Sequence, residues 1–123
     1  AQASLTGSTG LTCPDPRLRI LTPLTGQTYI AGETLQIIGT AEYPGARRYQ
    51  LEYRPAGNNE WKLIDRPRKD MRLDLLAEWD TTGLSVGSYE LRLSPVDTNN
   101  IRLANSSPCT IIVNLIEGSP SQP

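Results

Sequence analysis

Short stretches with apolar side chains at every second position recur along the 123-residue chain and constrain its fold more than any other feature. This period is typical of a β-strand that buries one face and exposes the other. Seven stretches show it, with these inward positions: Leu18 and Ile20; Leu35, Ile37, Gly39 and Ala41; Tyr49, Leu51 and Tyr53; Trp61 and Leu63; Leu73, Leu75, Ala77 and Trp79; Tyr89, Leu91 and Leu93; Cys109, Ile111, Val113 and Leu115.

Turn-forming clusters such as "YPGA", "PAGNNE" and "DTNN" separate these stretches. Ten glycines and ten prolines suit a loop-rich β protein better than a helical bundle. Because each strand must bury its apolar face, two sheets have to pack together. The sequence therefore predicts an all-β domain over residues 13–116, a seven-stranded antiparallel β-sandwich with an extended N-terminal tail (1–12) and a polar C-terminal tail (117–123).

The two cysteines lie near opposite ends of this domain. Cys109 has the parity of the inward residues in the last strand, and Cys13 precedes the first strand. Two unrelated buried thiols are one interpretation of this placement. A disulfide between Cys13 and Cys109 is the favoured one, and it would indicate an oxidising compartment.

Three longer segments resemble bacterial extracellular Ig-like or fibronectin type III-like modules: "RILTPLTGQTYIAGETLQIIGTA", "YQLEYRPAGNNEWKLI" and "EWDTTGLSVGSYELRLSPVD". The resemblance covers about residues 17–116 and implies a non-catalytic part of a secreted or cell-envelope protein. It also implies that Gly87 and Tyr89 form a tyrosine corner, in which the phenol bonds to a nearby backbone group.

A candidate nucleophile lies in "GLSVG", which matches the G-x-S-x-G pattern around Ser85. That pattern needs a histidine base and a helix after the serine. The chain has no histidine, and a strand pattern follows. Asp74, Glu78 and Asp80 are carboxylates at even spacing, on the predicted solvent face. We therefore expect no catalytic residues, no cofactor and no enzymatic activity.

Oxygen ligands for calcium are close together in Asp97–Asn100, "DTNN". The segment lacks the glycine and the distal glutamate of an EF-hand loop. Asp and Asn are also common in hairpin turns, because both tolerate a left-handed backbone. A turn without a bound metal is the favoured interpretation.

A basic run is a candidate contact for a polyanion through Arg66, Arg68, Lys69 and Arg72. Asp65 and Asp70 interleave with it, and it lacks the aromatic residues that stack on bases. The net charge is −1, so no overall field attracts nucleic acid. A solvated loop is favoured over a site for polyanionic wall polymer, and we expect no nucleic-acid partner.

Aromatic residues offer a candidate glycan platform at Tyr43 and Trp61. Because the chain has no phenylalanine, its Trp and Tyr residues must supply the aromatic part of the core. Exposed rings at Tyr43 and Trp61 would favour the glycan platform, and buried rings would favour a core role. "NSS" at Asn105 is a glycosylation sequon that matters only where the source glycosylates.

The N-terminal tail is a candidate assembly segment, with Leu5 and Leu11 as its large apolar residues. An extended tail can add a strand to a neighbour's sheet edge, and such a head-to-tail contact builds an open filament. No apolar run approaches the roughly 18 residues that span a bilayer, so membrane insertion is not expected.

These features together predict a structural or interaction module at the cell surface. Its expected partners are copies of itself or another surface protein. The alternatives are an accessory module that binds glycan or cell wall, and a spacer domain of a larger secreted protein.

Overall fold

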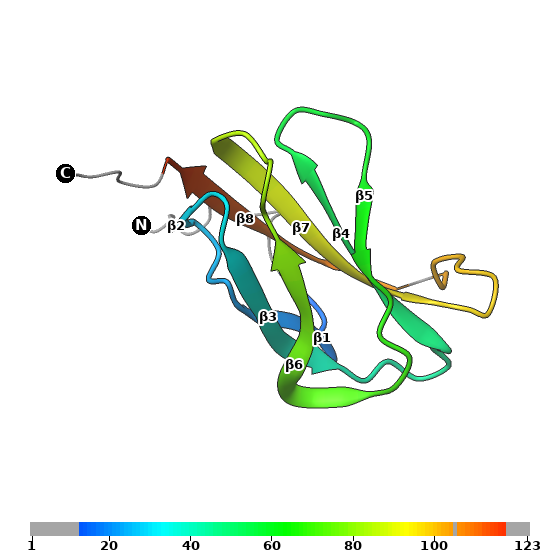
Figure 1. The fold of residues 1–123 in the computed structure, drawn as a ribbon. Helices are drawn as coiled ribbons and strands as arrows, with labels where there is room; N and C mark the ends of the chain where they lie inside the picture. Colours follow the sequence, from blue (N-terminus) through cyan, green and yellow to red (C-terminus); the bar gives the residue numbers. More distant parts are fainter. Residues whose placement is uncertain (1–12, 105, 118–123) are drawn as a thin grey trace, which may run out of the picture.

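The computed structural model describes residues 13–104 and 106–117, which form eight β-strands (Figure 1). These are β1 (Leu18–Thr22), β2 (Gln27–Ile30), β3 (Thr34–Ala41), β4 (Arg48–Pro55), β5 (Lys62–Asp65), β6 (Met71–Asp80), β7 (Gly87–Val96) and β8 (Cys109–Ile116). The strands make a three-stranded sheet in the order β1-β3-β6 and a five-stranded sheet in the order β2-β8-β7-β4-β5. Within the described part of the chain, no helix is long and apolar enough to cross a membrane.

The two sheets pack face to face, which confirms the predicted all-β, two-layer architecture. Every second residue of β4, β7 and β8 points into the layer between the sheets, where Leu51, Leu91 and Val113 are completely buried. Ile37 of β3 meets them from the three-stranded sheet. Three aromatic rings, those of Tyr53, Trp79 and Tyr89, cluster at centroid distances of 5.2–6.2 Å.

The disulfide between Cys13 and Cys109 is present, as the sequence predicts. It joins the segment before β1 to the start of β8, and so connects the two sheets. Cys109 Sγ also accepts a hydrogen bond of 3.3 Å from the Ile20 backbone N–H. In the chain-entropy model, closing a loop of this size stabilises a fold by about 4–5 kcal/mol.

The predicted count of seven strands is wrong because β2 was not expected. This strand pairs in parallel with β8, while all the other paired strands are antiparallel. It forms one edge of the five-stranded sheet. Three of its four residues are exposed, so no alternation of buried and exposed residues marks it in the sequence.

The predicted inward positions of Leu73 and Leu75 in β6 are also wrong. Leu75 pairs with Ile38 and Ala77 pairs with Ile37, which leaves Leu76 as an extra residue in a β-bulge. The bulge changes which side chains face inward: Leu76 is buried, whereas Leu75 is 39% exposed and Leu73 is 66% exposed.

The expected alternation around Trp61 is displaced by one residue. Strand β5 begins at Lys62, its Leu63 is exposed, and Ile64 packs against the core. Trp61 lies just before the strand and stacks on the guanidinium groups of Arg54 and Arg92, with 4.4 and 4.1 Å to the ring centroid.

Candidate binding surface

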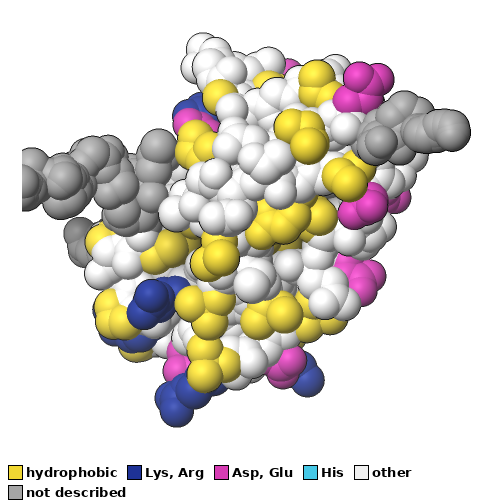
Figure 2. Space-filling model, turned by 90° about the vertical axis from the view of Figure 1, so that its left-hand side faces the viewer, with side chains coloured by type: hydrophobic (Ala, Val, Ile, Leu, Met, Phe, Trp, Pro, Cys, Tyr) yellow, Lys and Arg dark blue, Asp and Glu magenta, His cyan; other side chains and the backbone are white. Residues whose placement is uncertain are grey.

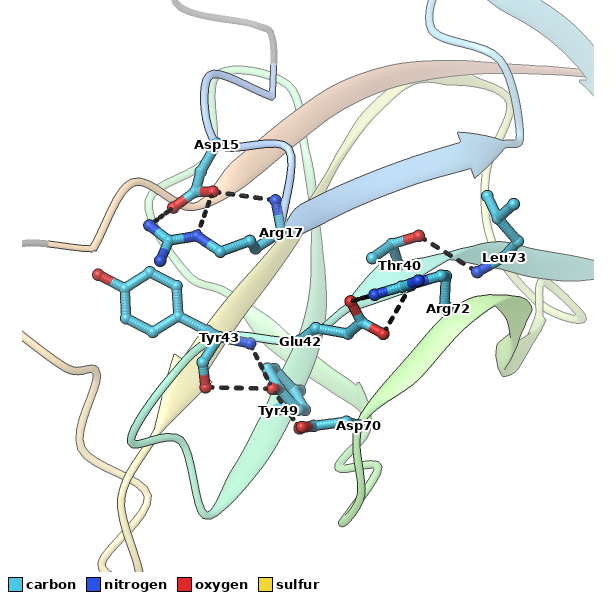
Figure 3. Close-up of polar contacts among 9 residues, drawn as sticks. All are labelled: Asp15, Arg17, Thr40, Glu42, Tyr43, Tyr49, Asp70, Arg72 and Leu73. Carbon is cyan, nitrogen blue, oxygen red and sulfur yellow. Dashed lines mark hydrogen bonds and ion pairs between the residues drawn. The ribbon is translucent and has the colours of Figure 1, made fainter.

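The outer face of the three-stranded sheet carries a hollow of about 350 Å³. Residues at and before β1 form one wall, the end of β3 forms the floor, and the start of β6 forms the other wall. The lining residues are Pro16, Arg17, Arg19, Leu21, Thr40, Glu42, Arg72 and Leu73. Figure 3 shows five of them and the polar contacts that hold them.

Gly39 allows β1 to approach β3 closely beside this hollow. A Cβ atom at this position would collide with the backbone carbonyl of Arg19. Any other residue would therefore push β1 away from β3. The register shifts immediately after this close approach, between Ile20 and Thr22, and leaves Leu21 as the extra residue in the hollow.

Arg72 and Glu42 form a two-pronged ion pair across the floor of the hollow (Figure 3). The guanidinium Nε donates to Glu42 Oε2 at 3.0 Å, and its terminal nitrogen donates to Oε1 at 3.0 Å. This hydrogen bonding raises the pKa of Arg72. The pair links the end of β3 to the start of β6 and neutralises both charges.

Arg17 is fixed in the same way by Asp15. One carboxylate oxygen accepts from the backbone N–H and from Nε of Arg17, both at 2.9 Å, and the other accepts from the terminal nitrogen at 2.8 Å. These hydrogen bonds lower the pKa of Asp15 below its ordinary value. The guanidinium also lies 4.8 Å from the centre of the Tyr43 ring.

The Tyr49 hydroxyl ties three segments together beneath the hollow (Figure 3). It accepts a hydrogen bond of 2.7 Å from the Tyr43 backbone N–H and donates one of 2.7 Å to Asp70 Oδ1. Burial raises the pKa of Tyr49 well above its ordinary value, and the bond to Asp70 adds to the rise. The network holds Glu42 and Arg72 in place through their neighbours in the chain.

Leu73 has a backbone conformation that non-glycine residues rarely adopt, with a φ of 52°. Its N–H donates to the hydroxyl of the buried Thr40 at 3.2 Å, which holds this conformation in place. The result is a large apolar side chain held out toward solvent. Such strained positions are often found at functional sites.

Four apolar side chains form a group on this face, which we call the outer apolar row: Leu21, Ile38, Leu73 and Leu75. Ile38 lies at its centre on β3 and pairs with Leu75 on β6. Thr22, next to Leu21, pairs with Ile38 from β1. Figure 2 shows hydrophobic side chains spread across the side of the molecule that is on the left in Figure 1.

Charges of opposite sign lie on either side of Ile38 along the strands. Arg19 is level with Thr40, toward the end of β3, and Glu78 is level with Gln36, toward its start. Both side chains are exposed. Among residues 13–104 and 106–117 there are four ion pairs, and neither Arg19 nor Glu78 belongs to one of them.

The predicted basic run does not come together as one surface. Arg72 is paired with Glu42 on the three-stranded sheet, whereas Arg66 donates to Gln50 Oε1 on the five-stranded sheet at 3.0 Å. Arg68 and Lys69 are exposed in the loop between β5 and β6. The run is therefore divided between the two layers.

The two residues of the candidate glycan platform also lie apart. Tyr43 is held beside Tyr49, near the start of β4, and Trp61 stacks on Arg54, near its end. Five residues of strand separate those anchors, or about 17 Å. Both rings are half-buried. They do not form a continuous platform.

The candidate calcium segment is a closed turn. Asp97 Oδ1 accepts hydrogen bonds from the N–H groups of Asn99 and Ile101, at 2.8 and 3.0 Å. Asn100 has a φ of 63°, the left-handed conformation that Asn tolerates. The Asp97 carboxylate thus already serves as an acceptor for its own turn.

Ser85 lies in the turn that leads into β7, and its carbonyl accepts a hydrogen bond of 2.7 Å from the Tyr89 hydroxyl. Gly87 has a φ of 140°, which side chains rarely allow. The two glycines of "GLSVG" therefore serve a turn here, and a strand follows them.

The other candidate residues of the sequence, Leu5, Leu11 and Asn105, lie outside the described residues.

Sequence reasoning missed most of the outer face: Arg19, Leu21, Ile38, Thr40 and Glu42. Two apolar doublets were the available signal, Ile37–Ile38 in β3 and Leu75–Leu76 in β6. In each doublet one side chain must face away from the core, or a bulge must intervene. In β3, Ile38 faces away from the core, and in β6 a bulge forms at Leu76.

Comparisons with protein-family models, with curated proteins and with solved structures found no match to this chain. The function proposed below therefore depends on the geometry of the chain itself.

Proposed function

We propose that the chain is a non-enzymatic, Ig-like extracellular module that joins protein subunits in a cell-surface assembly. The outer apolar row is the observation that carries this proposal. Leu73 and Leu75 expose apolar surface on the side of the sheet that faces away from the core. Clustered apolar side chains on the outside of a soluble domain are typical of protein interaction sites.

The polar groups around the hollow favour binding over catalysis. Arg72 and Glu42 satisfy each other, and Asp15 and Arg17 do the same. The pKa of Asp15 is lowered, the opposite of the shift that a carboxylic acid needs to donate protons near neutral pH. These groups are therefore suited to shaping a rigid surface.

The disulfide between Cys13 and Cys109 supports the extracellular part of the proposal. Disulfides persist in oxidising environments, and a disulfide is compatible with a secreted protein. In this proposal, residues 1–12 provide a second means of attachment, because an extended tail can add to the sheet edge of a neighbour.

Electron microscopy of the protein isolated from the cells that produce it, combined with chemical cross-linking on those cells, tests this proposal. We expect ordered assemblies, or cross-links from this chain to a copy of itself or to another surface protein. Dispersed single chains without cross-links would contradict the proposal. A variant without residues 1–12 separates the two attachments, because assembly that persists unchanged excludes a role for the tail.

A further inference from the structure

We propose that the outer face of the three-stranded sheet binds the same face of a second copy, related by a two-fold axis that passes over Ile38. This inference deepens the proposed function, on which it rests, by naming the partner and the surface. It follows from the positions of the outer apolar row and of the two charges on either side of Ile38.

Ile38 lies midway between Arg19 and Glu78. Arg19 pairs with Thr40, two residues beyond Ile38 on β3, and Glu78 pairs with Gln36, two residues before it. Arg19 is on β1 and Glu78 is on β6, the two strands that flank β3. Each charge is therefore displaced from Ile38 by about 7 Å along the strands and by about 5 Å across them, in opposite directions.

A two-fold axis exchanges two points when it bisects the line between them. An axis in the plane of this face, through Ile38 and perpendicular to the line from Arg19 to Glu78, places Arg19 of each copy over Glu78 of the other. Because such a contact is isologous, both Arg–Glu pairs form at once. Ile38 meets Ile38 of the second copy, and the remaining leucines lie around this centre.

The strand spacing also determines how the two sheets cross. The line from Arg19 to Glu78 is inclined by about 35° to the strands, given a rise of about 3.4 Å per residue and a strand spacing of about 4.8 Å. The two-fold operation then makes the strands of the two copies cross at about 70°. This angle is closer to the orthogonal class of sheet packing than to the aligned class.

Arg19 is the arginine of this face without an ion-pair partner among the described residues, and Glu78 is the carboxylate that mirrors it across Ile38. Arg17 and Arg72 are already bound by carboxylates of their own chain. Asp74 and Asp80 on β6 are exposed as well, and each accepts a hydrogen bond from a backbone N–H of its own segment. In Figure 2, Lys and Arg side chains gather toward the lower left, while most Asp and Glu side chains lie along the right. A face that carries opposite charges on either side of an apolar centre is complementary to itself, which favours a second copy over a different protein.

Charge reversal tests this arrangement in the full-length chain. Sedimentation equilibrium measures the dimerisation constants of the wild type, Arg19→Glu, Glu78→Arg and the double variant Arg19→Glu/Glu78→Arg. Lys62→Glu is the control for Arg19→Glu, because it makes the same charge change at an exposed position on β5. Thermal unfolding checks that each variant folds.

We expect the wild type to dimerise more weakly as salt increases. Each single reversal weakens dimerisation at least about tenfold, because it places like charges opposite each other twice. The double variant restores it to within about threefold of the wild type, and Lys62→Glu leaves it unchanged. A monomeric wild type, or single variants that dimerise normally, would overturn the inference.

The two proposals fail in different ways. Assemblies that persist on cells while Arg19→Glu has no effect would leave the proposed function intact and remove this surface as the contact. The absence of any assembly or cross-link on cells would remove the proposed function, whatever the purified chain does.

Discussion

The centre of the outer face of the five-stranded sheet, on β4 and β7, carries paired charges, whereas the outer face of the three-stranded sheet presents the outer apolar row. On the five-stranded sheet, Glu52 lies opposite Arg92 and Arg54 lies opposite Glu90. The two ion pairs have N–O distances of 2.8 and 2.6 Å. Trp61 covers both guanidinium groups.

This difference suits the five-stranded sheet to solvent exposure and the three-stranded sheet to contact with another protein. Cross-strand charge pairs satisfy each other, and the arginine stems shield apolar atoms beneath them. On the three-stranded sheet the ion pairs lie around the hollow, and neither Arg19 nor Glu78 has an ion-pair partner among the described residues. We call the outer face of the five-stranded sheet the self-sufficient face, because its central charges are paired within the chain, and that of the three-stranded sheet the incomplete face.

The largest expected effect comes from neighbouring residues on β3 that face opposite ways. Ile37→Ala should lower the free energy of unfolding by about 2–5 kcal/mol, because it opens a cavity beneath a fully buried side chain. Ile38→Ala should cost about 1 kcal/mol or less, because its side chain lies on the outer face. Urea denaturation of both variants measures the difference. Equal losses would mean that Ile38 belongs to the core and that the outer apolar row is misassigned.

The Tyr49 hydroxyl provides the next test, since it supports the hollow. Tyr49→Phe leaves the Tyr43 N–H and the Asp70 carboxylate without this partner. We expect a loss of about 1–3 kcal/mol in the free energy of unfolding. A Tyr49→Phe variant as stable as the wild type would show that the hydroxyl does not hold the segments of Tyr43 and Asp70 in place.

The same hydroxyl predicts a pH dependence at high pH. Burial raises the folded-state pKa of Tyr49, so the unfolded chain loses this proton first, near the ordinary value of 10.0. This contribution to stability is complete below that pH and is lost as the pH rises through the folded-state pKa. Urea denaturation across this range should show a smaller decline for Tyr49→Phe. Burial also raises the pKa of Tyr89, which adds the same pH dependence to the wild type and to Tyr49→Phe. If the free energy of unfolding falls equally with pH in both proteins, Tyr49 is not the source of the decline.

The smallest expected effect concerns the self-sufficient face. Trp61→Ala should cost about 1–2 kcal/mol in stability, because two cation–π contacts are lost. It should not change self-association, because Trp61 lies on the other sheet. Leu73→Ser is the matched change on the incomplete face, with the opposite expectation: little loss of stability and weaker association. Weaker association in Trp61→Ala alone would reverse the roles of the two faces.

The sequence was sufficient to predict the two-layer all-β fold and the disulfide, because strand alternation and cysteine position report directly on burial. It was not sufficient for β2, an edge strand in which one residue, Tyr29, packs against the core and the other three are exposed. The β6 bulge at Leu76 misled the assignment of Leu73 and Leu75, because alternation assumes an unbroken register.

The candidate site was harder to predict than the core for a similar reason. Its residues come from β1, β3 and β6, and only strand pairing brings Arg19 and Glu78 to equal distances from Ile38. The basic run and the aromatic pair were more visible in the sequence. The fold places the members of each in separate locations, which local patterns do not encode.

The most direct test of the difference between the two faces compares backbone amide NMR spectra of the wild type at low and high protein concentration. We expect concentration-dependent shifts at residues of β1, β3 and β6 around Ile38, and unchanged signals for Glu52, Trp61 and Arg92. Shifts confined to the five-stranded sheet, or spectra that are the same at both concentrations, would contradict the account.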